Sequence, residues 1–511
     1  MGYHEDLIQM ILEGKIRDKE ELQRAKIDLC RRYGMRGVPR SSETLALVGE
    51  EDRPLVEEVL RRKPVRTLSG VAVVAVMTSP APCPHGKCIY CPGGVESGSP
   101  QSYTGKEPAA RRGASYAFDP YEQVKGRIEQ LEAIGHGTDK IDLIVMGGTF
   151  TSRPMEYQTD FVKRCFEAMN GAPSATLEDA QLLNESAPHR CIGMTIETRP
   201  DAMTGEQAAL SMGLGMTRVE MGVQILDEGI LRAVNRGHGL QAVIDGTRAA
   251  KRSGLKVCYH LMPGLPGSSP EKDLDSFRRM FADPDFRPDM LKLYPTLVVK
   301  GTKLHDMWSS GDYRPYTTEE AVEVMAEMKT MVPPWARIQR IQRDIPVPLV
   351  EAGVDKGHLR ELIQERMRDK GQGCRCIRCR EVGLRGIKDY DPKDVEMRET
   401  AYEASDGREH FISLELPHLD ALVGYVRLRT GDGDIAGVRE LKVFGRMVPL
   451  GRRTEGYQHR GHGKELLARA EEVARSRGCS SVRITSGIGV RPYYASLGYR
   501  RDGVYMVKRL G

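Results

Sequence analysis

Short runs rich in β-branched residues alternate with amphipathic segments between residues 71 and 331, and this alternation limits the fold more than any other feature. The apolar runs are 71–77, 141–148, 192–200, 218–224, 256–264 and 291–295. The helix candidates lie at 119–135, 157–169, 205–213, 241–253, 271–282 and 318–331. Strands that alternate with helices pair in parallel. The pattern therefore predicts an α/β fold built on a partial or full barrel of parallel strands.

Residues suited to chemistry follow the predicted strands, and in such barrels the active site lies at the carboxyl ends of the strands. A loop with three cysteines follows the first run, and Gly147 and Gly148 end the second. Lys292 and Tyr294 end the sixth run. We predict that Lys292 and Tyr294 contact the substrate.

The cysteine loop carries Cys83, Cys88 and Cys91 within "PCPHGKCIYCPGG". No segment has the eighteen consecutive apolar residues of a membrane span, and the N-terminus lacks a signal-like stretch, so we expect a cytoplasmic protein with reduced thiols and no membrane contact. A [4Fe–4S] cluster held by three thiolates leaves one iron open, to which S-adenosylmethionine (SAM) can bind. His85 offers a fourth ligand, so a zinc site remains an alternative.

A second cysteine group, Cys374, Cys376 and Cys379, lies in a segment that we interpret as a connector. Its C-x-C-x2-C spacing fits a structural zinc ion, with His358 as a candidate fourth ligand. Unliganded thiols are the alternative.

After about residue 400 the pattern changes to successive strands, followed by "QHRGHG" (458–463) and a helix at 464–476. Glycines at the start of a helix let backbone N–H groups approach a pyrophosphate. The pattern resembles the acetyl-CoA-binding motif of the GNAT acetyltransferase superfamily, and "YYASLGY" (493–499) follows at the expected place. We predict that Tyr494 acts as an acid towards the CoA sulfur.

Four regions are expected. Residues 1–66 form a helical extension whose basic segments, 31–40 and 61–66, are candidates for phosphate contact. Residues 67–345 form the barrel, 346–398 the connector, and 399–511 an α+β GNAT domain.

The combination resembles the Elongator protein 3 family, whose members pair a radical-SAM domain with a GNAT domain. Blocks in family order include "CIYCPGG", "DKIDLIVMGGTF", "RVEMGVQ", "MPGLPG", "RELKVFG", "QHRGHG" and "YYASLGYRRDGVYMVK". The resemblance implies a tRNA wobble-uridine (uridine 34) enzyme. A 5′-deoxyadenosyl radical from SAM would take hydrogen from the methyl group of acetyl-CoA, giving 5-carboxymethyluridine in tRNA. Whether it works alone, as a homo-oligomer or with accessory subunits stays open.

The same resemblance implies site residues. Cys83, Cys88 and Cys91 would hold the cluster. The family's acetyl-CoA contacts match Lys140, Glu440, Leu441, Lys442, Val443, Gly461, His462, Gly463 and Tyr493. Because the radical must meet the acetyl group, we expect both pockets to open on the same side of the molecule.

Two other functions compete with this hypothesis. One is a protein lysine N-acetyltransferase in which the iron–sulfur domain is a scaffold. The other is a non-catalytic tRNA-binding module, against which the intact cysteine triplet and G-x-G argue.

Overall fold

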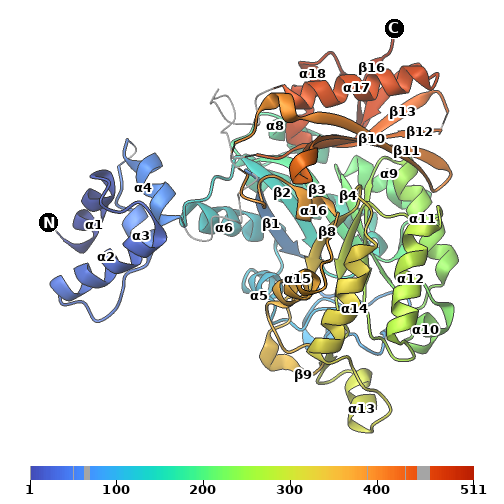
Figure 1. Ribbon diagram of the computed structural model, residues 1–511, viewed down its shortest axis with the longest axis horizontal. Coiled ribbons are helices and arrows are strands. Elements are labelled where there is room, and N and C mark those ends of the chain that lie inside the picture. The colour runs from blue at the N-terminus through green and yellow to red at the C-terminus, as the bar shows by residue number, and fades with distance from the viewer. Residues whose placement is uncertain (1, 50, 62–69, 388, 432, 446–460) are drawn as a thin grey trace.

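The computed structural model describes residues 2–49, 51–61, 70–387, 389–431, 433–445 and 461–511. Figure 1 shows a small group of N-terminal helices beside a large body that contains two sheets. One sheet forms the centre of the large body, and the other lies across one end of it.

The first sheet has seven parallel strands that are neighbours in chain order. They are β1 (Ala72–Met77), β2 (Lys140–Met146), β3 (Arg190–Thr198), β4 (Arg218–Gln224), β5 (Lys256–Leu261), β6 (Met290–Leu293) and β8 (Arg337–Ile341). The first and last strands are not paired with each other, so the barrel is partial, as predicted. Sequence analysis missed β8, because its "RIQRI" segment carries two arginines and a glutamine and lacks a continuous apolar run.

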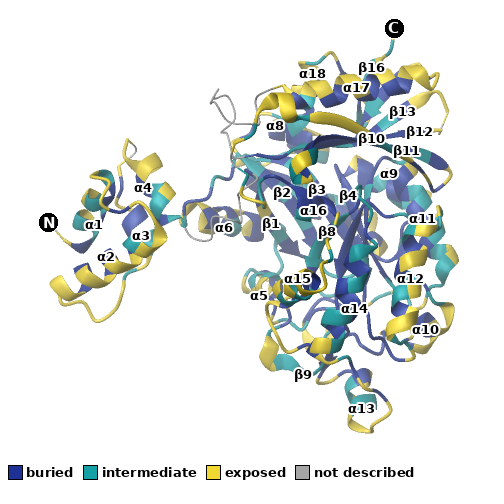
Figure 2. Ribbon diagram, viewed as in Figure 1, coloured by how far each residue is buried: buried dark blue, intermediate teal, exposed yellow. Residues whose placement is uncertain are grey.

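Helices follow the strands, and the longer ones cover the outer face of this sheet, whereas α13 (Lys303–Ser309) projects from the body (Figure 1). They are α5 (Pro108–Ser115), α6 (Pro120–Glu132), α7 (Met155–Asn170), α8 (Leu177–Asn184), α9 (Gly205–Gly213), α10 (Glu228–Ala233), α11 (Leu240–Arg252), α12 (Pro270–Ala282), α13 (Lys303–Ser309) and α14 (Thr318–Thr330). Several begin at a capping side chain, such as Asp119 before α6 and Thr317 before α14. Figure 2 shows the strands buried and the outer faces of the helices exposed.

The second sheet confirms the predicted GNAT architecture. Its strands are β10 (Glu396–Ala404), β11 (Gly407–Leu416), β12 (Ala421–Thr430), β13 (Ile435–Val443), β14 (Ser481–Ile484), β15 (Arg500–Asp502) and β16 (Tyr505–Arg509). All neighbours pair antiparallel except β13 and β14, which are parallel over residues 435–438 of β13. Helices α17 (His462–Ser476) and α18 (Arg491–Ala495) complete this part. Past Val438, β13 runs on beyond its pairing with β14, and no described strand pairs with its last residues on that side.

Between the two sheets, the chain forms α15 (Leu359–Asp369) and α16 (Ile377–Arg380). Val350–Ala352 form strand β9, which pairs with β7 (Val298–Val299), and α15 begins after it at Leu359. Gly353, with φ +112°, separates the two elements in a backbone conformation that favours glycine.

The N-terminal helices are α1 (Tyr3–Leu12), α2 (Lys19–Arg32), α3 (Ser41–Leu45) and α4 (Arg53–Leu60). Their apolar faces form a small core of their own. Arg61 joins this group to the large body by donating from Nε to the backbone oxygen of Gly135 at 2.6 Å.

The GNAT sheet is attached to the end of the half-barrel at which the strands begin. Arg439 on β13 donates to both carboxylate oxygens of Asp289, at 2.7 and 2.6 Å, just before β6. The glycine at 487 lies so close to β3 that a Cβ there would sit 2.1 Å from the carbonyl oxygen of Ile192. Among the described residues, no helix is long and apolar enough to cross a membrane.

Candidate active site

A cavity of about 120 Å³ lies at the carboxyl ends of the half-barrel strands. Cys83 and Cys88 line it from the loop after β1, and Gly148 lines it from the turn after β2. Lys292 and Tyr294 line it from the end of β6. The structure therefore brings the first cysteine group and both predicted substrate contacts to one place.

Each thiol of the first group has a polar neighbour. Cys83 lies 3.5 Å from the Thr149 hydroxyl, and Gln101 donates to Cys91 at 3.5 Å. Cys88 lies 3.2 Å from Nε2 of His85. Hydrogen bonds to cysteine sulfurs tune the potential of an iron–sulfur cluster, so this environment suits one.

The spacing of these thiols also distinguishes an iron–sulfur cluster site from a zinc site. Four ligands at about 2.3 Å from zinc bring thiolates within roughly 4 Å of one another. Among the described residues, the three-ligand groups with all ligand atoms within 4.8 Å do not include Cys83, Cys88 and Cys91. His85 is engaged with Arg199 at 2.5 Å, and burial followed by the charge of Arg199 lowers its pKa to about 4. This geometry fits a cluster better than zinc.

The glycine pair after β2 leaves no room for side chains. Gly147 has φ +133°, and a Cβ there would lie 2.0 Å from Oγ1 of Thr78. Gly148 has φ +94° and lines the cavity. The backbone can therefore approach a ligand closely at this turn.

Lys292 forms an ion pair with Glu220 on β4 inside the half-barrel. Glu220 is fully buried and also lies 2.9 Å from Nε2 of His260. Burial by itself would lower the pKa of Lys292, but the Glu220 carboxylate holds it above its ordinary value. Sequence analysis did not assign Glu220 a role, because its pairing with Lys292, 72 residues further along the chain, emerges only from the fold.

A second cavity of about 610 Å³ lies between the half-barrel and the GNAT sheet. The predicted acetyl-CoA contacts that line it are Lys140, Glu440, Leu441, Lys442, Val443 and Tyr493, and Tyr494 lines it as well. Burial would raise the pKa of Glu440, but Lys256 and Arg427 beside it hold that pKa at about 2. The cavity therefore presents a carboxylate among cations.

The glycine motif lies at the start of α17. Gly461 caps this helix with φ +88°, and no side-chain hydrogen bond caps its N-terminus. The described lining of the larger cavity does not include Gly461, His462 or Gly463. Gly463 nevertheless adjoins it, since a Cβ there would lie 3.0 Å from the Tyr493 hydroxyl. The first part of the motif, 458–460, lies outside the described residues.

The two cavities lie at opposite ends of the half-barrel, so the expectation that they open on one side is wrong. The smaller cavity is at the ends of β2–β6, and the larger is at their starts. The physical reason is the attachment of β13 through Arg439 to Asp289, which fixes the GNAT domain at the end where the strands begin.

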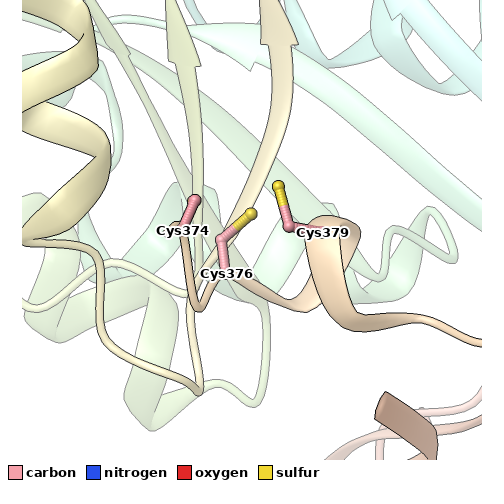
Figure 3. Close-up of side chains that lie close together, drawn as sticks. All are labelled: Cys374, Cys376 and Cys379. Carbon is pink, nitrogen blue, oxygen red and sulfur yellow. The ribbon is translucent and has the colours of Figure 1, made fainter. Parts of the chain in front are cut away.

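The second cysteine group is compact. The sulfurs of Cys374, Cys376 and Cys379 lie within 4.8 Å of one another (Figure 3). His358, the predicted fourth ligand, is not in this group within the described part of the chain; it lies exposed at the start of α15. Burial and the charge of Arg378 lower the pKa of Arg360, two residues further on, and the three thiols of this group act against that shift.

Comparison with known proteins covers almost the whole chain. Family models match as the ELP3 N-terminal domain (2–68), the Radical SAM superfamily (80–280), the Radical_SAM C-terminal domain (288–369) and the Acetyltransferase (GNAT) family (375–499). A tRNA uridine(34) acetyltransferase of Methanocaldococcus infernus is 49% identical over 99% of this chain and 98% of its own. Elongator complex protein 3 of Homo sapiens is 42% identical over 99% of this chain and 96% of its own.

A solved structure agrees with these relatives. Archaeal Elp3 of M. infernus with an N-terminal deletion (1–46) superposes with a TM-score of 0.77 at 45% identity. The match covers 87% of this chain and all of that one.

Proposed function

Because this chain belongs to the Elongator protein 3 family, we propose that it is a tRNA uridine(34) acetyltransferase that builds 5-carboxymethyluridine from acetyl-CoA and SAM. One observation carries the proposal at the level of the structure. A three-thiol loop suited to a SAM-binding cluster and a cavity suited to an acetyl thioester belong to the same half-barrel, one at each end.

The smaller cavity holds the radical chemistry. Cys83, Cys88 and Cys91 would hold a [4Fe–4S] cluster, which supplies the electron that cleaves SAM to a carbon radical. Gly148 offers backbone at the cavity wall without a side chain, which suits the amino acid part of SAM. Lys292 and Tyr294 are placed to contact the uridine, Lys292 as a charged donor held by Glu220.

The larger cavity suits acetyl-CoA. Its lining has eight cationic side chains and three acidic ones. The cations are Lys140, Arg190, Arg218, Lys256, Arg337, Arg378, Arg439 and Lys442, and the acids are Asp142, Glu381 and Glu440. This excess attracts the phosphates of CoA, and the start of α17 adds backbone N–H groups for the pyrophosphate. Burial raises the pKa of the Tyr494 phenol, which keeps it protonated and able to donate to the CoA sulfur.

The same charge excess argues against a protein lysine N-acetyltransferase. A lysine side chain that approached the thioester would bring another ammonium group to a wall that already has more cations than acids. No described feature favours that alternative.

The N-terminal helices offer a surface for tRNA. Residues 31–40 carry four arginines, and Arg31, Arg32, Arg36 and Arg40 are all exposed. Arg31 and Arg32 form ion pairs within the helical group, at 3.8 and 3.2 Å. We assign phosphate contact to this segment. Segment 62–66, the rest of the second basic run, lies outside the described residues.

The second cysteine group would hold a structural zinc ion next to α16. Three thiols within 4.8 Å match the spacing of thiolates around zinc. Arg360 would balance the negative charge of three thiolates on one divalent ion. Homo-oligomerisation and accessory subunits remain predictions.

An anaerobic assay tests the function. The purified protein, with its cluster reconstituted, is incubated with SAM, a reductant, acetyl-CoA and tRNA, and the nucleosides are analysed by mass spectrometry. We expect 5-carboxymethyluridine from the wild type and none from Cys88→Ser. The matched control is Cys479→Ser, a lone buried cysteine in the GNAT domain. Cleavage of SAM without any modified uridine would refute the proposal.

A further inference from the structure

One layer of side chains separates the two cavities. On β4, Arg218 lines the larger cavity and Glu220, two residues later, lines the smaller. On β6, Met290 likewise lines the larger cavity and Lys292 lines the smaller. Residues i and i+2 of a strand face the same side of the sheet. The interior of the half-barrel is therefore shared by both cavities, without a thick core between them.

The interior side of β2 stays partly accessible along its whole length. Lys140, Asp142, Ile144 and Met146 are each half-buried, whereas the alternate residues of the strand are buried against the helices. Asp142 lines the larger cavity and Met146 the smaller, with Ile144 between them in neither. From Lys140 to Met146 the strip covers six residue steps, or roughly 20 Å at the rise of a strand.

The wall opposite this strip is charged, where barrels of this class place aliphatic side chains. Arg218 lies 3.4 Å from Asp142 and 3.6 Å from Glu220. Glu220 in turn pairs with Lys292, at the edge of the smaller cavity. The charges therefore form a chain from one cavity to the other.

Three buried polar atoms of this interior make no hydrogen bond within the described residues. Nε of Arg218 and Oε1 of Glu220 face each other as an ion pair at 3.6 Å, whereas Oγ1 of Thr195 has neither a hydrogen bond nor an ion pair. All three residues are at least nine-tenths buried. A buried polar atom without a hydrogen bond destabilises the fold, so the Thr195 hydroxyl favours a polar ligand in this interior.

A metal ion fits this interior less well than a polar organic group does. Glu220, Cys258 and His260 offer ligand atoms within 4.8 Å of one another. However, the Lys292 ammonium already pairs with Glu220 and lies 4.0 Å from Glu197. A divalent cation at this point would meet that ammonium at close range.

We propose that the interior of the half-barrel, along β2, is a passage through which the acyl end of the acetyl thioester reaches the smaller cavity. This inference rests on the proposed function. The cavities open at opposite ends, so an acyl group bound on β13 reaches the cysteine loop most directly through the axis. Oγ1 of Thr195, midway along the interior on β3, makes no hydrogen bond within the described residues and can donate to the acyl oxygen.

Two variants narrow the passage without touching either cavity lining. Ile144→Trp fills the accessible strip on β2, and Thr195→Leu fills the opposite β3 position, which lies between Gly193 of the larger cavity and Glu197 of the smaller. The matched control is Leu183→Trp, which adds the same bulk on the exposed face of α8. Acetyl-CoA labelled with deuterium in its methyl group is the probe.

The readouts are the dissociation constant of acetyl-CoA, the rate of SAM cleavage, and deuterium transfer into 5′-deoxyadenosine. We expect both narrowing variants to keep the wild-type dissociation constant of acetyl-CoA and the wild-type rate of SAM cleavage. Deuterium transfer should fall by about 100-fold, because misplacing a reacting group slows a reaction by about this factor. Transfer at the wild-type rate in Thr195→Leu or Ile144→Trp, with acetyl-CoA still bound, overturns the passage. Absence of transfer in the wild type instead contradicts the proposed function.

Discussion

At the scale of single residues, the smaller cavity depends on glycines, which have no side chain, as much as on its reactive cysteines. The thiols of Cys83 and Cys88 line the smaller cavity, but Gly147 and Gly148 decide how closely the backbone approaches it. The reactive residues show their roles in the sequence. The need for glycine at position 147 follows from its positive φ and from its close approach to Thr78, which lies far away along the chain.

The substitution Gly147→Ala tests this need. A Cβ there meets Thr78 at 2.0 Å in a backbone conformation that costs about 1–3 kcal/mol for other residues, so the turn must shift. We expect SAM cleavage to fall at least tenfold, measured as 5′-deoxyadenosine. Gly171→Ala is the control, because Gly171 also has positive φ but has open space around it. Equal losses in both variants would contradict a role for the turn at the cavity.

At the scale of elements, the connector is held by its cysteines. Helix α16 has only four residues, too few to be stable by itself. Cys376 and Cys379 lie at its start and within it, and Cys374 reaches the same point from the preceding loop (Figure 3). A shared ion would bind these segments together.

We expect Cys376→Ser to lose about one zinc per chain and to unfold at a lower temperature, since structural zinc contributes folding energy directly. Metal analysis by mass spectrometry should find the iron content unchanged, because the first cysteine group is separate. Cys191→Ser, in β3, serves as the control. Zinc retained in Cys376→Ser would exclude this group as its site.

At the scale of the whole molecule, buried charges join the two domains. Arg439, Asp289 and Glu409 are all fully buried and form ion pairs at 2.6–2.8 Å. Lys251 on α11 lies 4.0 Å from Asp289 and 3.9 Å from Glu409. The network fixes the orientation of β13, and through it the position of the larger cavity.

The network makes stability depend on pH. Burial lowers the pKa of Lys251 to about 8, from an ordinary value of 10.5. Between these values the unfolded chain binds more protons than the folded one, so this residue makes stability rise with pH. From pH 8 to 10 we expect the wild type to gain on the order of 2 kcal/mol relative to Lys251→Met, measured by urea unfolding. Parallel pH profiles for the two proteins would contradict the assignment.

Binding of tRNA tests the N-terminal helices. We expect the double variant Arg36→Gln/Arg40→Gln to bind tRNA more weakly and to lower the slope of log K against log salt by about 0.7–0.9 per lost phosphate contact. Fluorescence anisotropy over a salt series measures this. Arg24→Gln, on α2 and near Glu20, is the control. An unchanged salt slope would place the phosphate contacts elsewhere.

The type of fold and most of the reactive groups were predictable from local sequence patterns. Strand periodicity predicted six of the seven parallel strands, because apolar alternation is local. The spacing of Cys83, Cys88 and Cys91, like the glycine motif near 461, is also local. The end of the half-barrel that each site occupies could not be predicted in this way. That depends on Arg439 meeting Asp289, 150 residues apart in the chain, and on Gly487 fitting against Ile192. Contacts between such distant residues leave no periodic trace in the sequence, so the opposed cavities and the passage between them emerge only once the chain is folded.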